Sequence, residues 1–275
     1  MLLQYDNYEK PSPEEIRQET RLIRLMDDGY AKLFFYQNIR DTQLILRIIM
    51  NKPDLEVKSV ELQKHFYASG TSHGVIFDVY AVDSDGTQYD IEIQNDSEGA
   101  SIYRAVFNSA MMTVNSLKKN ERYSNLAKHK QVVIFITLHD VMKKNLPLYT
   151  IKRTCLETGE EFSDGTCIIY VNTAHKDYTT AIGKLIHDFR CENTKELYYK
   201  ELAETASYIY QDKGGRFMKS LEAFKRITMA EEEARVYNNV AISLIKDGLY
   251  ALNKIAELCH MTLEQVQELA ASVKA

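Results

Sequence analysis

The chain has 275 residues, of which 45% are hydrophobic and 27% are charged, and its formal net charge is −5 at pH 7. These values fit one large globular domain, or a core domain with an appendage, and exclude collagen-like, disordered and low-complexity classes. No apolar run approaches the roughly 20 residues of a membrane span, and the acidic start lacks secretory-signal features, so we expect no membrane partner. Four scattered cysteines without C-x-x-C spacing indicate free thiols in a reducing cytoplasm.

The first part of the chain predicts two helical stretches and a strand. Residues 11–26 open with a capping box at Ser12, which is typical of a helix start. Apolar residues then recur at helical spacing through residues 31–51. Residues 55–69 alternate between apolar and polar side chains and therefore predict a strand.

Residues 76–95, "IFDVYAVDSDGTQYDIEIQN", predict a β-hairpin because two alternating runs flank a turn. A two-residue turn would set apolar positions opposite charged ones. A three-residue turn at residues 84–86 ends in glycine, which suits the left-handed position of this turn type, and it pairs the apolar positions with one another. In that register Asp78 lies directly opposite Glu92, with Cβ atoms about 5 Å apart. Gln94 is then a diagonal neighbour of Asp78.

The later elements follow the same signals. Residues 100–120 predict a helix, residues 131–138 predict a strand buried on both faces, and residues 149–173 predict a second hairpin. Residues 177–275 are almost all helical in pattern. This order predicts an α/β core with a mixed central β-sheet flanked by helices, plus a helical C-terminal appendage. The apolar stripe expected on the helix at 100–120 consists of Ile102, Val106, Met111, Val114 and Leu117.

The hairpin carries an unusual concentration of acids. Residues 76–100 contain seven Asp or Glu and no Lys or Arg. One interpretation is a solvated acidic face that binds nothing. The other is a divalent cation held by Asp78 and Glu92, since like charges paired across two strands are destabilising and hard oxygen ligands suit Mg²⁺ or Mn²⁺. We assign Asp83 and Asp85 to the turn and leave Asp90 undecided.

The charge is also segregated along the chain. Residues 101–153 contain ten Lys or Arg and two Asp or Glu, a local balance of 10 − 2 = +8. A solvated basic face is one interpretation. An acidic pocket beside a basic stretch is also what a metal site acting on a polyanion needs.

These patterns resemble the PD-(D/E)XK nuclease superfamily, in which an Asp on one strand is followed on the next by E-x-K or a variant. The chain is most similar to the bacterial recombination-promoting nuclease (Rpn) and transposase family. The resemblance rests on "DDGYAKLFFYQN", "FDVYAVDSDGTQYDIEIQN", "YRAVFNSAMMT" and "LKKNERYSNLAKHKQVVIFITLHD", and it covers roughly residues 11–171. It implies a restriction-endonuclease-like core at residues 1–176 and a separate helical region at 177–275.

The resemblance also implies a function. Asp78 and Glu92 would hold a catalytic Mg²⁺ (or Mn²⁺), and Gln94 would stand in the place of the superfamily lysine, orienting water or phosphate. The activity expected is a magnesium-dependent endodeoxyribonuclease linked to recombination or mobile elements, with DNA as its partner. Because a Gln amide supplies no charge, Arg104 or Lys118 on the following helix could provide the cation. Two alternatives stay open: a catalytically inactive nuclease-fold DNA-binding protein, and a protein-interaction module.

Three further features of the sequence have their own interpretations. The last two predicted helices have helix-turn-helix spacing, with a capping box at Thr262, but the second helix is acidic, which favours packing or self-association into a homo-oligomer over DNA contact. His187 and Cys191 lie one helical turn apart without further ligands, so we interpret them as structural. Asp28 is either a further acidic site residue or a helix cap.

Overall fold

The computed structural model describes residues 24–66, 74–95, 99–117, 120–211, 237–238 and 240–274. The chain forms two compact units, residues 1–214 and 215–275. The helix predicted at residues 11–26 lies almost entirely outside the described residues. The predicted division at residue 176 stays a prediction, although the described helices that follow it as far as residue 211 belong to the first unit.

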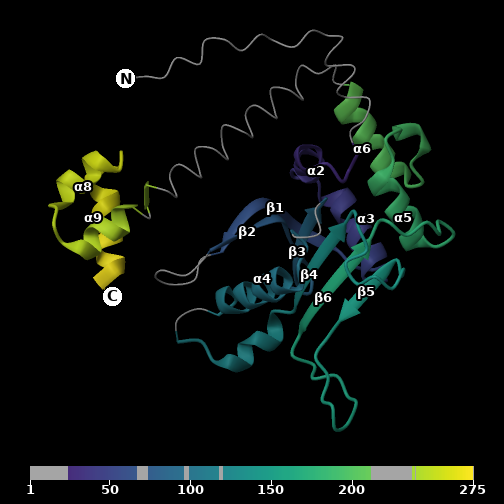
Figure 1. Ribbon diagram of the computed structural model, residues 1–275, viewed down its shortest axis with the longest axis horizontal. Helices are drawn as coiled ribbons and strands as arrows, with labels where there is room; N and C mark the ends of the chain where they lie inside the picture. Colours follow the sequence, from purple (N-terminus) through teal and green to yellow (C-terminus); the bar gives the residue numbers. More distant parts are fainter. Residues whose placement is uncertain are drawn as a thin grey trace. The chain divides into compact units, whose positions relative to one another are not determined.

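The first unit is built on a six-stranded mixed sheet, ordered β1-β2-β3-β4-β6-β5 (Figure 1). β1, β2 and β3 are antiparallel, β3, β4 and β6 are parallel, and β5 returns antiparallel to β6. This arrangement confirms the predicted α/β fold with a mixed sheet. The strands are β1 (Val57–Phe66), β2 (Val75–Asp83), β3 (Gln88–Gln94), β4 (Gln131–Thr137), β5 (Leu148–Ile151) and β6 (Thr166–Asn172).

Helices cover both faces of this sheet (Figure 1). α4 packs against β4 and β6 on one face, while α2 and α3 lie on the other, with α5 packed against α3. Among the described residues of the first unit, the helices are α2 (Asp28–Phe35), α3 (Ile39–Ile49), α4 (Ile102–Asn115), α5 (Ala181–Arg190) and α6 (Lys200–Gln211), with short 3-10 helices η2 (Tyr123–Lys128) and η3 (Thr194–Glu196).

The hairpin formed by β2 and β3 has the predicted register. Val79 pairs with Ile91 and Ala81 pairs with Tyr89. The turn has three residues, with Gly86 at a φ of 80°, in the left-handed region that glycine adopts without steric cost. The apolar faces of the two strands are buried, so burial of these side chains fixes the register.

The helix predicted at residues 31–51 is instead two helices. α2 ends at Phe35, and Gln37 adopts a left-handed φ of 51°. Asn38 then caps α3, its side chain accepting a hydrogen bond from the backbone N–H of Asp41 at 3.2 Å. The apolar periodicity continues across this break because both helices bury apolar faces in the same core, so the pattern alone could not reveal it.

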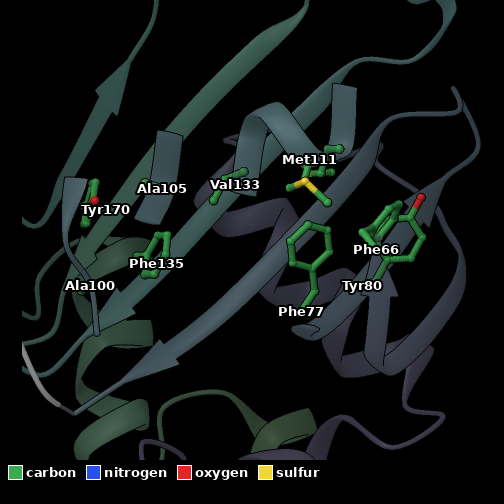
Figure 2. Packing of buried hydrophobic residues seen from close by; sticks show 10 residues of the cluster. Phe66, Phe77, Tyr80, Ala100, Ala105, Met111, Val133, Phe135 and Tyr170 are labelled. Carbon is green, nitrogen blue, oxygen red and sulfur yellow. The ribbon is translucent and has the colours of Figure 1, made fainter. Parts of the chain in front are cut away.

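Three of the five residues predicted for the apolar stripe on α4 do not face the core, whereas Met111 does. Ile102, Val106 and Val114 are more than half exposed, and the buried side of the helix contains Ala105, Asn108, Ser109, Met111 and Met112. Figure 2 shows Met111 and Ala105 of α4 packed with Phe77, Val133, Phe135 and Tyr170 of the sheet. One of the two polar side chains on this face, Asn108, donates a hydrogen bond to the buried carboxylate of Asp90 on β3.

The second unit contains α8 (Leu252–Leu258) and α9 (Leu263–Lys274) around a small core with Ile255, Cys259 and Val266. The predicted capping box is present. The backbone N–H of Thr262 donates to the Gln265 side chain at 2.9 Å, and the N–H of Gln265 donates to the Thr262 hydroxyl at 3.2 Å. Among the helices that the structure describes, none has the length and apolar character needed to cross a membrane.

Candidate active site

Two carboxylates from neighbouring strands meet near the middle of the sheet. Glu92 of β3 is fully buried, while Asp78 of β2 is partly buried. The pairing of Val79 with Ile91 and of Tyr80 with Asp90, continued by one residue, sets Asp78 opposite Glu92. The side chain and the backbone N–H of Asp78 both interact with the Glu92 carboxyl group. The structure therefore brings together the two predicted metal ligands.

The Glu92 carboxylate is held by groups on both of its oxygens. Oε2 accepts a short hydrogen bond from Arg104 Nη2 and a longer one, 3.2 Å, from Gln94 Nε2. Arg104 is fixed in turn, because its Nη1 donates to the Gly99 carbonyl at 3.0 Å. Its guanidinium carbon lies 5.8 Å from the centre of the Phe135 ring, within cation–π range. Gln94 and Arg104, both proposed from the sequence, thus contact the same carboxylate oxygen.

A third carboxylate lies on the same face of β3. Asp90 is fully buried two residues before Glu92, and its Oδ2 accepts a hydrogen bond from Asn108 Nδ2 at 2.8 Å. The same nitrogen lies 3.4 Å from Glu92 Oε1. Asn108 is fully buried on α4, one helical turn beyond Arg104. One helix face therefore provides donors to both carboxylates of β3.

Asp78 has its own neighbour on the edge strand. Gln63 of β1 donates from Nε2 to Asp78 Oδ1 at 3.3 Å. Gln63 has a φ of 51°, a left-handed conformation that is rare in the middle of a strand and costs about 1–3 kcal/mol. This strained residue lies directly beside the carboxylate pair.

The electrostatics of the site disfavour ionised acids. Burial and the negative charge of Asp78 raise the pKa of Glu92 from its ordinary 4.5 to about 8, although Arg104 acts in the opposite direction. Burial and the neighbouring Glu92 charge raise the pKa of Asp90 well above its ordinary range. One arginine is not enough to compensate this group of carboxylates. Positive charge added between Asp78 and Glu92 would relieve the repulsion.

The donors fit a hard divalent cation. Asp78 and Glu92 offer carboxylate oxygens, and Mg²⁺ in proteins is often held by one or two carboxylates, with water and phosphate completing its shell. Within the described ranges, no three Asp, Glu, His or Cys side chains converge closely enough to form an all-protein metal cage. The chemistry therefore matches an open site that shares its ion with solvent and substrate.

The remaining sequence predictions map as follows. Asp83 is a turn residue, because its Oδ1 accepts from the backbone N–H groups of Asp85 and Thr87 at 3.0 and 2.8 Å. His187 contacts Asp188, at 3.1 Å, and Cys191 donates to the Asn193 carbonyl. Lys118 and the side chain of Asp28 lie outside the parts that the structure describes.

The basic stretch, residues 101–153, carries less uncompensated positive charge in the structure than its sequence suggests. Lys152 forms an ion pair with Glu161 at 2.9 Å, and Arg153 pairs with Asp164 at 2.6 Å. Both acids lie just beyond residue 153, in the connection between β5 and β6. Arg104 is also engaged by Glu92, so the excess of +8 overstates the charge available to a polyanion.

Two residues of this network did not emerge from the sequence. Asn108 lies four positions after Arg104, so helical spacing would have placed both on one face once Arg104 was proposed. Gln63 gave no signal, because a left-handed residue inside an alternating strand pattern has no sequence signature. Asp90, undecided from the sequence, is a buried neighbour of Glu92.

Comparison with known proteins identifies a family for the chain. Residues 32–247 match a family model described as PD-(D/E)XK nuclease family transposase. Searches of curated proteins and of solved structures returned no match. The match spans more than half of the chain and confirms the resemblance seen in its motifs. The chain therefore belongs to the PD-(D/E)XK nuclease family transposases.

Proposed function

We propose that the chain is a metal-dependent DNA endonuclease that hydrolyses phosphodiester bonds in recombination or mobile-element biology, acting in the cytoplasm. The observation that carries the proposal is the facing pair Asp78 and Glu92. The two carboxylates lie on neighbouring strands, Glu92 is fully buried, and its pKa is raised to about 8. A protein gains no stability from such a pair, so its placement favours a function that supplies positive charge from outside the chain.

In this proposal Asp78 and Glu92 are the ligands of Mg²⁺ or Mn²⁺. When bound, such an ion lowers the pKa of a coordinated water and polarises the scissile phosphate. Gln94 stands beside Glu92 and orients water or a phosphate oxygen through its amide, since it lacks the charge of a lysine. Arg104 supplies the positive charge near the phosphate that Gln94 cannot provide.

The second unit, α8 and α9, is proposed to pack or self-associate rather than contact DNA.

The direct test combines metal binding with cleavage. Calorimetric titration of Mn²⁺ and nicking of supercoiled plasmid are measured for the wild type, Asp78→Asn and, as an exposed control, Asp54→Asn. We expect Asp78→Asn to lose nicking by about 10³-fold, because one of two carboxylate ligands is gone, and to bind Mn²⁺ more weakly. Asp54→Asn should behave as the wild type. Equal nicking by Asp78→Asn and wild type would refute the proposal.

One observation favours an inactive nuclease-fold DNA-binding protein as the second candidate. Gln94 occupies the position of the superfamily lysine, and its amide donates to Glu92 rather than standing free. This alternative predicts DNA binding that weakens with salt, and no nicking with Mg²⁺ or Mn²⁺. The same plasmid assay separates it from an active enzyme.

The contribution of Gln94 can be tested from a second position. A Cβ at Gly99 would lie 2.2 Å from Gln94 Oε1, the end of a flexible side chain. We expect Gly99→Ala to fold normally but to displace Gln94 from Glu92, so that nicking falls about tenfold, as in Gln94→Ala. Asp54→Asn, which changes an exposed side chain, is again the control. Wild-type nicking by Gln94→Ala would contradict the role of Gln94, whereas wild-type nicking by Gly99→Ala alone would mean that the added Cβ does not displace Gln94 from Glu92.

A further inference from the structure

We propose that Asn108 is a positioning residue that sets the orientation of the Glu92 carboxylate for metal binding, with Asp90 as its support. The inference rests on the proposed function, because it assigns a role toward the same cation. It concerns a side chain outside the D…E-x-Q motif. The observations are the hydrogen bonds, burial and unpaired atoms of Asn108 and Asp90.

The two oxygens of Glu92 face different partners. Oε2 accepts hydrogen bonds from the side chains of Arg104 and Gln94, while Oε1 lies 3.4 Å from Asn108 Nδ2. A carboxylate held from both sides has a defined plane, whereas Arg104 and Gln94 alone act on one oxygen. Asn108 therefore acts on Oε1, where it adds to the contacts of Asp78, Arg104 and Gln94 that resist rotation of Glu92 about its last side-chain bond.

Asp90 holds the side-chain amide of Asn108 in place against Glu92. Asn108 Nδ2 carries two hydrogens, and its shorter hydrogen bond, 2.8 Å, goes to Asp90 Oδ2. Asp90 and Asn108 are both fully buried, so their relative positions are fixed by packing between β3 and α4. Asp90 itself is a support for Asn108 in this proposal, and the metal ligands remain Asp78 and Glu92.

A contribution to folding stability does not explain the pairing of Asp90 with Asn108. Asp90 Oδ1 and Asn108 Oδ1 are buried without a hydrogen-bond partner among the described residues. Buried polar atoms without partners are costly, and two apolar side chains of similar size would fill the space at lower cost. A pair retained in spite of that cost indicates a role in the site.

The test separates positioning from folding. Asn108→Leu is compared with the double variant Asp90→Leu/Asn108→Leu, which removes both polar partners and should be at least as stable as the single variant. In both, we expect the Mn²⁺ dissociation constant from calorimetry to rise about 10- to 100-fold. The plasmid-nicking rate should fall more at subsaturating than at saturating Mn²⁺, because the ligands themselves are intact but bind the ion more weakly.

Asn115→Leu is the matched control. Asn115 lies on the same helix, is exposed, and donates to the Met111 carbonyl at 2.9 Å, away from the carboxylates. Its Mn²⁺ constant should equal that of the wild type. An unchanged Mn²⁺ constant in folded Asn108→Leu would overturn the positioning role and leave the nuclease proposal standing. Mn²⁺ binding by a wild type that never nicks DNA would refute the nuclease proposal but not the positioning role, and a wild type that binds no Mn²⁺ would overturn both.

Discussion

Glu92→Gln is expected to abolish nuclease activity while making the metal-free protein more stable at alkaline pH. The pKa of Glu92 is raised to about 8 by burial and by Asp78, against an ordinary value of 4.5. This difference corresponds to about 5 kcal/mol of stability that is present below pH 4.5 and is lost as the pH rises to 8. A glutamine keeps the shape of the side chain without its charge, so the Glu92→Gln variant avoids this loss. The same substitution removes the ion pair between Glu92 and Arg104, which makes the gain in stability smaller.

The measurement is thermal unfolding in EDTA between pH 5 and 9. The midpoint of the wild type should fall through this range, while that of Glu92→Gln should change much less. Addition of Mn²⁺ at pH 8.5 should raise the midpoint of the wild type but not that of Glu92→Gln. Plasmid nicking by the variant should drop by at least about 10³-fold. Glu56→Gln, an exposed acid on the first unit, is the control. A parallel dependence of the unfolding midpoint on pH in the wild type and Glu92→Gln would show that the pKa of Glu92 is not raised.

Arg104→Gln is expected to have opposite effects on metal binding and on cleavage. The guanidinium now contacts Glu92 Oε2, where it competes electrostatically with an added cation. Its removal should tighten Mn²⁺ binding by about three- to tenfold. The same change should slow nicking at saturating Mn²⁺ by about 10²-fold, because a positive charge near the phosphate is lost. Arg104→Lys should recover part of the rate.

The two measurements are calorimetric titration of Mn²⁺ and initial nicking rates at saturating Mn²⁺, both at low salt. Arg122→Gln, which removes an exposed arginine from the start of η2, controls for the general loss of positive charge. A parallel loss of metal binding and rate in Arg104→Gln would instead mean that the arginine acts by holding Glu92 in place. Wild-type nicking by the variant would exclude Arg104 as the replacement for the superfamily lysine.

The sequence predicted the hairpin that carries the site because two independent signals agreed. Alternation set the buried faces of β2 and β3, and the glycine at position 86 selected a three-residue turn, which together leave one register. That register alone places Asp78 opposite Glu92. The family match then followed from motifs that were already visible in the chain.

Other parts of the site could not be predicted, for identifiable reasons. The break between α2 and α3 depends on a left-handed Gln37, and glutamine has no special preference for that conformation. The inward face of α4 was wrongly assigned because its apolar side chains are largely exposed while Asn108 is buried beside charge. Periodicity assumes that apolar residues point to the core, and this assumption fails where a helix must serve buried carboxylates.

The change of strand direction at β3 has a consequence for the motion of the sheet. β3 pairs antiparallel with β2 and parallel with β4, so it forms the seam between the two halves of the sheet. Asp78 and Glu92 lie on opposite sides of the β2–β3 boundary, and above pH 8, where Glu92 is ionised, their repulsion acts to separate the two strands. Amide hydrogens of β2 and β3 should therefore exchange with solvent faster than those of β4, and a cation between the carboxylates should slow them. A bound ion would then hold β2 and β3 together in addition to taking part in cleavage.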